Sequence, residues 1–154
     1  MNLDKHLIAS GVVSAGIFAS TGSLKIAAAS FVTGVFMDLD HVIDYWCEYP
    51  FSLNVRRFFE VYDRVSLEKT RLFLHSAELL VAAAAAAYFT RSGLIAGLVL
   101  GVSQHLALDQ FFNEVYPAGY FFVYRLSTGF KAQKIFRNTR RGNSDGNYQK
   151  TSGS

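Results

Sequence analysis

The chain has 154 residues, of which 51% are hydrophobic and only 18% charged, and its formal net charge is +3. This length corresponds to one compact domain, and so small a net charge gives no reason to expect a nucleic acid as partner. The single cysteine excludes an internal disulfide and a zinc site built on paired cysteines.

Four apolar segments, rich in glycine and alanine, predict helices. Gly22-Ser23 separates the first two and Arg91-Ser92-Gly93 the last two, so we expect two helical hairpins. At about 1.5 Å per residue these helices are about 21–28 Å long, short for a hydrocarbon core of about 30 Å but apolar for a soluble bundle. The composition favours a membrane-embedded all-α bundle, with a soluble all-α core as the alternative. The segments cover residues 7–21, 24–37, 72–90 and 94–108.

Three further segments differ in composition. Apolar and charged residues alternate at helical spacing over residues 51–71, which predicts an amphipathic helix at the membrane interface or, alternatively, a cap over a soluble bundle. The aromatic residues of 111–130 suit an interfacial belt or a fifth short helix broken by Pro117-Ala118-Gly119. From Lys131 the chain is basic and then rich in Gly, Ser and Asn, so we expect a domain over residues 1–130 and a disordered tail over 131–154.

The four histidines stand near carboxylates at the ends of the apolar segments. Glu78 follows His75 by three residues and Asp109 follows His105 by four, which on a helix puts the members of each pair on one face. In an up-down-up-down bundle these helix ends meet on one side. The groups expected there are His6, Asp38, Asp40, His41, Asp44, His75, Glu78, His105 and Asp109.

These side chains together predict a metal site. Singly, a histidine at a helix end can cap carbonyls and an aspartate can cap a helix. Burying several such groups in an apolar chain costs free energy unless they are paired or bind a cation. Imidazole and carboxylate ligands suit zinc, with manganese as an alternative, and they are numerous enough for one or two ions. With no thiolates and with ligands to spare, a catalytic site with open positions is expected rather than a closed structural one.

The reaction expected of such a site is hydrolysis by metal-activated water attacking phosphorus or a carbonyl carbon. Glu78 or Asp44 would be the catalytic base or a supporting ligand. The chain has neither a phosphate-binding loop of the Walker type nor a GxSxG motif, which argues against P-loop and serine chemistry.

Basic residues are distributed unevenly along the chain. Of the 15 lysines and arginines, only Lys25 and Arg91 fall at the two hairpin tips. The others lie on the side of the histidines or in the tail. By the positive-inside rule we expect the site and both termini on the cytoplasmic side of the membrane.

The runs "FMDLDH", "LHSAEL" and "SQHLALD", after an early histidine, resemble a known family, the LexA-binding, inner-membrane-associated proteins described as metal-dependent hydrolases. The resemblance covers about residues 1–112 and extends more distantly to zinc-dependent phospholipase C. Met37 stands where the family has a proline, and Leu74 where it has a hydroxyl residue. The resemblance implies a location in the inner membrane and the metal ligands His6, Asp38, Asp40, His41, His75, His105 and Asp109.

We therefore expect a membrane-bound, metal-dependent hydrolase that acts on a phosphoester. The substrate would be linked to a lipid, and the protein would be in contact with membrane lipid. The alternative is a non-enzymatic membrane protein in which the metal staples the helices and the basic tail binds a partner or anionic lipid. A metal transporter fits less well, because its polar groups would run through the bilayer rather than gather on one side.

Overall fold

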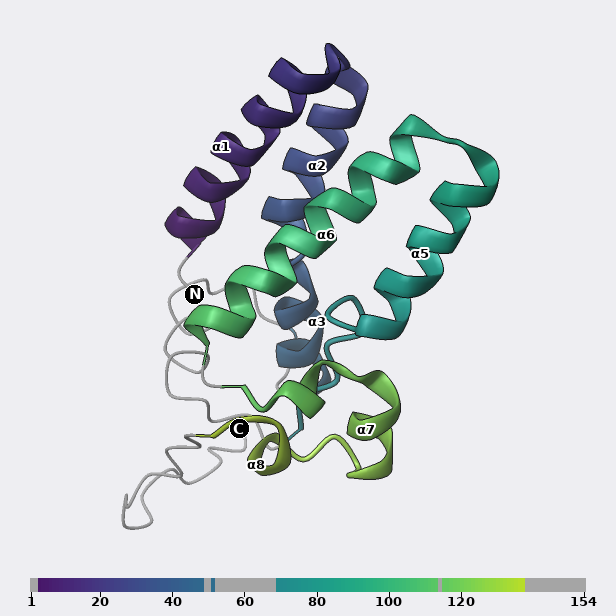
Figure 1. The fold of residues 1–154 in the computed structure, drawn as a ribbon. Helices are drawn as coiled ribbons and strands as arrows, with labels where there is room; N and C mark the ends of the chain where they lie inside the picture. The colour runs from purple at the N-terminus through teal and green to yellow at the C-terminus, as the bar shows by residue number, and fades with distance from the viewer. Residues whose placement is uncertain (1–2, 49–50, 52–68, 114, 138–154) are drawn as a thin grey trace.

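The computed structural model describes residues 3–48, 51, 69–113 and 115–137 (Figure 1). Over these residues the chain is helical and forms no β-sheet, so the predicted all-α class is confirmed. Four helices make two antiparallel hairpins whose tips lie at the same end of the molecule (Figure 1). They are α1 (Leu3–Thr21) with α2 (Leu24–Phe36), and α5 (Ala77–Thr90) with α6 (Gly93–Phe112).

Serine residues begin three of these helices. Ser23 caps α2 and Ser92 caps α6 at the hairpin turns, each accepting a hydrogen bond from the backbone N–H three residues later. Ser76 caps α5 in the same way, with its Oγ 3.0 Å from the amide of Leu79. Such caps satisfy amide groups that have no partner within the helix, which explains why the helices begin where they do.

The two hairpins meet through α2 and α6, which pack together more extensively than any other pair of described helices. Gly97 and Gly101 of α6 allow this close approach. A Cβ atom at these positions would collide with the backbone oxygen atoms of Ile26 and Ser30. The contact therefore requires glycine on α6 and fixes the position of one hairpin against the other.

The third helix begins later than the sequence indicates. Residues 72–76 were expected in it, but they form a loop, and α5 starts at Ala77. Leu72 has a φ of 45°, which a helix cannot contain. The second helix breaks at Met37–Asp38, and the chain continues as α3 (Leu39–Glu48).

Short helices close the end of the molecule opposite the hairpin tips (Figure 1). The aromatic segment forms a 3₁₀ helix, η1 (Pro117–Tyr120), and α7 (Phe122–Ser127). Residues 131–137, expected in the tail, instead include α8 (Ala132–Ile135), of which Ala132 and Ile135 are buried.

The expected amphipathic helix over 51–71 falls mostly outside the described residues, as does the remaining tail over 138–154. The described end of segment 51–71 is not helical: Lys69 pairs with Lys131 in a β-bridge.

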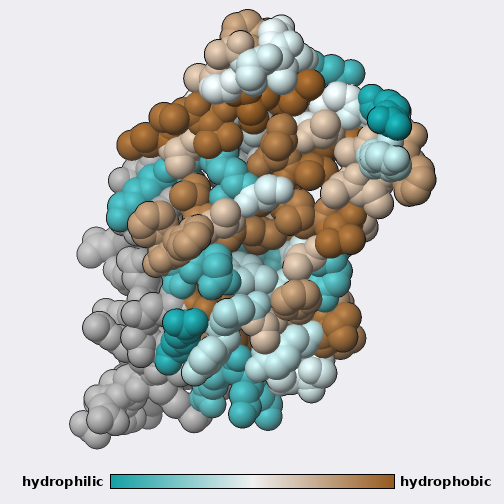
Figure 2. Space-filling model, in the orientation of Figure 1, coloured by the Kyte–Doolittle hydropathy of each residue, from teal (hydrophilic) through white to brown (hydrophobic). Residues whose placement is uncertain are grey.

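Apolar side chains cover the outside of the hairpins. Figure 2 shows brown, hydrophobic surface over much of the two hairpins and more teal, hydrophilic surface toward the end with α7 and α8. The apolar helix α5 has no buried residue at all. Two helical stretches, Leu24–Cys47 and Gly93–Phe112, are long and apolar enough to cross a membrane.

Candidate metal centre

The histidines and aspartates converge at the end of the bundle where α2, α3 and α6 meet the loop before α5. Their ligand atoms form two groups, within each of which all atoms lie within 4.8 Å of one another. One group joins four side chains and the other joins three, and Asp38, at the break between α2 and α3, belongs to both. The groups are His6, Asp38, His105 and Asp109, and Asp38, His41 and His75.

The rings of His75 and His105 face each other through their Nε2 atoms, which are 3.1 Å apart. The Nδ1 atom of His105 lies 2.8 Å from the carbonyl oxygen of Gly34, to which it can only donate its proton. The Nδ1 atom of His75 is 3.4 Å from Oδ2 of Asp40, which likewise accepts. Two neutral rings in these tautomers would point two lone pairs at each other. Cations bound at these nitrogen atoms would remove the repulsion, so the arrangement fits a metal centre.

His6 extends the first group from α1. Its ring is completely buried and stacks on that of His105, with centroids 4.1 Å apart. Neither ring nitrogen has a hydrogen-bond partner, although Nε2 lies 3.2 Å from Oδ1 of Asp109. A buried imidazole without hydrogen bonds is costly. Coordination of an ion shared with Asp109 would satisfy Nε2.

Asp38 is the carboxylate that both groups share. Its Oδ1 atom is 3.3 Å from Nε2 of His105, 3.5 Å from Nε2 of His41 and 3.6 Å from Nε2 of His75. Its Oδ2 atom is 3.8 Å from Nε2 of His6. Asp38 would therefore be positioned to supply a carboxylate oxygen to an ion in either group.

Other side chains orient the ligands. Oδ2 of Asp40 contacts Nδ1 of His75 and accepts a hydrogen bond of 2.6 Å from the amide of Leu74. Asp40, predicted as a ligand, thus lies behind His75 rather than within either group. Asn113 donates a hydrogen bond of 2.7 Å to Oδ1 of Asp109. Contacts of this kind fix ring orientation and tautomer around bound metals.

The two carboxylates predicted to be catalytic lie outside both groups. Oδ2 of Asp44 accepts hydrogen bonds from the amides of Arg71 and Leu72, at 2.7 and 3.2 Å, and holds the loop that carries His75. The carboxylate of Glu78 accepts hydrogen bonds from the amides of Phe122 and Val123. The expected pairing of His75 with Glu78 on one helix face is wrong, because His75 precedes the helix.

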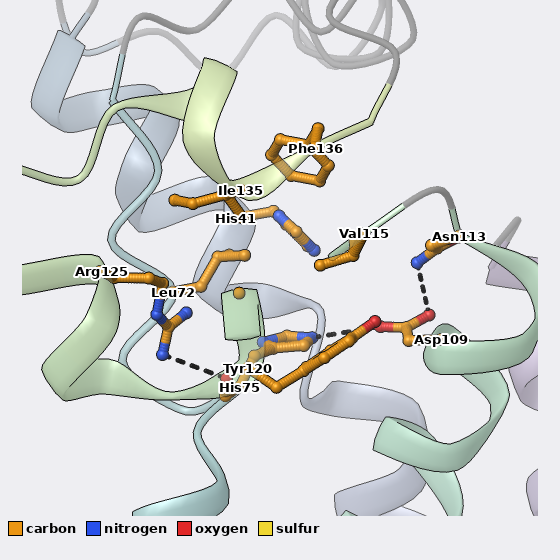
Figure 3. Close-up of a pocket in the computed structure, with 11 residues that line it drawn as sticks. His41, Leu72, His75, Asp109, Asn113, Val115, Tyr120, Arg125, Ile135 and Phe136 are labelled. Atoms are coloured by element: carbon orange, nitrogen blue, oxygen red, sulfur yellow. Dashed lines mark hydrogen bonds and ion pairs between the residues drawn. The ribbon is translucent and has the colours of Figure 1, made fainter. Parts of the chain in front are cut away.

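A small pocket adjoins the second group and is lined by His41, His75 and Asp109 (Figure 3). Its free volume of about 20 Å³ admits a water-sized group. Tyr120 and Arg125 line its other sides. Sequence reasoning missed both of these residues. Arg125 carried one signal, since it is the only charged residue among the aromatic and apolar residues 115–130.

Two groups around this pocket have shifted protonation equilibria. Burial disfavours the charged form of His75, but hydrogen bonds with Asp38 and Asp40 outweigh burial and raise the pKa of its ring above 6.5. Burial, reinforced by the charge of Asp109, raises the pKa of Tyr120. The tyrosine hydroxyl therefore stays protonated at neutral pH and remains a hydrogen-bond donor.

Comparison with models of known families, with curated proteins and with solved structures gives no match. The resemblance drawn from the sequence runs therefore stays a prediction. The site is defined by its own geometry, which brings four imidazoles and two carboxylates from separate parts of the chain within reach of metal ions.

Proposed function

We propose that this protein is a membrane-bound hydrolase of a phosphoester, in which one or two divalent ions activate water. The observation that carries the proposal is the pair of ligand groups that share Asp38. Zinc suits these imidazole and carboxylate ligands, and manganese is the alternative. Bound ions would supply Lewis acidity and lower the pKa of water at the site.

The unequal size of the two groups supports catalysis. A group of four protein ligands can saturate a tetrahedral ion, as structural sites do, whereas a group of three leaves a position open. His41 and His75 of the three-ligand group also line the pocket (Figure 3). The open position would thus be on the side from which a small group can enter.

The surroundings of the site support a substrate at the membrane. Large apolar side chains next in sequence to residues of the site are exposed, namely Phe111 and Phe112 shortly after Asp109 and Phe121 directly after Tyr120, and these would suit acyl chains or the lipid interface. The two apolar stretches Leu24–Cys47 and Gly93–Phe112 support insertion. The basic residues gathered on the side of the site favour a cytoplasmic location for the site and both termini, in the inner membrane.

The hydrolase proposal is tested with purified protein in detergent, loaded in turn with zinc, manganese and magnesium. We expect hydrolysis of a member of a panel of soluble phosphodiesters and phospholipids. His41→Ala should abolish turnover while the four-ligand group still binds its ion, because only the three-ligand group loses a member. Lys25→Ala, at the distant hairpin tip, is the matched control and should leave turnover unchanged.

The closed four-ligand group favours one alternative, a protein whose metal only staples its helices. That protein would lose thermal stability in every ligand variant and would hydrolyse nothing in the panel. Absence of turnover by folded, metal-loaded protein would therefore contradict the hydrolase and support a metal site that only stabilises the helices. The topology is tested separately with a reporter fused to the C-terminus, and a periplasmic C-terminus would overturn it.

A further inference from the structure

Arg125 carries a buried charge that forms no direct ion pair within the described residues, although the carboxylates of Asp40, Glu78 and Asp44 act on it from a greater distance. Its side chain is completely buried, at 0% exposure. Nη2 donates a hydrogen bond of 3.1 Å to the carbonyl oxygen of His75, but Nε and Nη1 have no hydrogen-bond partner, and no carboxylate of the described residues forms an ion pair with the guanidinium. Packing against the ring of Phe122, 5.9 Å from its centroid, compensates only in part. A buried guanidinium with unsatisfied donors and no direct ion pair is costly, so a second partner is expected.

The position of Arg125 indicates where that partner would bind. Arg125 lines the pocket that His41 and His75 also line, so the guanidinium and the three-ligand group border the same space (Figure 3). Tyr120 lines it too, and its buried hydroxyl has no hydrogen-bond partner. The pocket thus combines unpartnered donors from α7 and η1 with predicted metal ligands from α3 and the loop before α5.

The chemistry of these groups selects one class of ligand. A guanidinium only donates hydrogen bonds, and a protonated phenol is a donor here, so the entering atom must be an acceptor. Next to a guanidinium and bound divalent ions, a negatively charged acceptor is favoured over a neutral one. An arginine fork matches the geometry of phosphoryl oxygens, and the pocket has room for one such oxygen.

We propose that Arg125 and Tyr120 form an oxyanion-binding subsite that holds a non-bridging oxygen of a phosphoryl group beside the three-ligand group. This inference rests on the proposed function and adds to it the residues that recognise the substrate. Arg125 neutralises the phosphoryl charge, and Tyr120 donates a hydrogen bond. The same carbonyl hydrogen bond that anchors Arg125 also ties the subsite to the loop of His75.

Binding of inorganic phosphate tests the subsite without requiring turnover. Calorimetric titration of the purified protein, both metal-loaded and treated with chelator, should show saturable binding that is tighter with metal. Arg125→Gln should weaken binding about tenfold or more, and Tyr120→Phe, which removes a single oxygen atom and keeps the ring, by severalfold. Arg137→Gln removes the same charge from an exposed residue outside the pocket and should change nothing.

Two additions keep the test decisive. Arg125→Lys preserves charge and stem length but not the fork, so it reports on geometry if Arg125→Gln fails to fold. Competition by glycerol phosphate or by phosphatidic acid in mixed micelles distinguishes a soluble phosphoester from a lipid headgroup. Phosphate binding that survives Tyr120→Phe and Arg125→Lys unchanged, or no phosphate binding by the folded protein, overturns the subsite. Binding that depends on Arg125 without any hydrolysis would instead refute the hydrolase and leave the subsite in place.

Discussion

The Nε2 atoms of His75 and His105 lie 3.1 Å apart, although each ring directs its other nitrogen to an oxygen acceptor. Gly34 is the acceptor for His105 and Asp40 the acceptor for His75. Each acceptor fixes a tautomer whose remaining lone pair faces the site. The fold has thus turned the free nitrogen atoms of two rings, from distant positions in the chain, toward the site, and such fixed tautomers are typical of histidines that bind metal.

Metal binding should depend on pH in a way that His75 determines. The raised pKa of His75 means that its protonated form stabilises the metal-free fold at low pH and that this contribution is lost as pH rises through that pKa. A metal ion needs the deprotonated ring, so affinity should fall as pH decreases through the same range. The thermal midpoint of metal-loaded protein should therefore exceed that of chelator-treated protein by a margin that widens as pH rises above about 6.5, the ordinary pKa of histidine. A margin independent of pH would contradict the coordination of His75.

Glu78 should contribute to stability rather than to proton transfer. Glu78→Ala leaves the amides of Phe122 and Val123, at the start of α7, without their acceptor and should cost about 1 kcal/mol with metal content unchanged. Glu78→Gln keeps one oxygen acceptor and should cost less. Thermal unfolding and metal analysis of both variants check this. Loss of turnover in a stable, fully loaded Glu78→Gln protein would restore Glu78 as the catalytic base.

The contact between α2 and α6 should not tolerate a methyl group. Gly97→Ala places a Cβ atom 2.5 Å from the backbone oxygen of Ile26, so the helices must separate, at a cost of about 1–3 kcal/mol. Gly16→Ala in α1 is the matched control, because its Cβ atom meets nothing within 4 Å and alanine is the better helix former. Thermal midpoints of the two variants should shift in opposite directions. Equal shifts would contradict the close contact between α2 and α6.

The sequence predicts the helices well and the ligand partners less well. Apolar runs and serine caps determine where helices form, and both are local features, so the hairpins could be anticipated. The pairing of His75 with Glu78 failed, because local spacing assumed a helix that begins only after Ser76. His75 is held instead by Asp40, 35 residues away, and such long-range contacts leave no periodic signal.

Long-range contacts also explain why the role predicted for Asp44 differs from its contacts and why Arg125 was not predicted in the site. Asp44 follows His41 by three residues, yet its carboxylate binds the amides of residues 71 and 72 rather than a shared cation. Arg125 stands in an aromatic segment that suggested a lipid interface, and only the fold brings it to the carbonyl oxygen of His75. Spacing along the sequence thus identified the types of residue in the site, whereas the partner of each side chain depends on tertiary contacts.

The number of ions bound by each variant tests the central claim that Asp38 serves both ligand groups. When both ligand groups are occupied, metal analysis by mass spectrometry of the folded, purified protein should find two divalent ions per chain, one for each group. His41→Ala should retain only the ion of the four-ligand group, and Asp38→Ala should lose both, because each group loses a carboxylate. Lys25→Ala should retain both. Two ions in Asp38→Ala, or none in the folded wild-type protein, would contradict a shared carboxylate at the centre of the site.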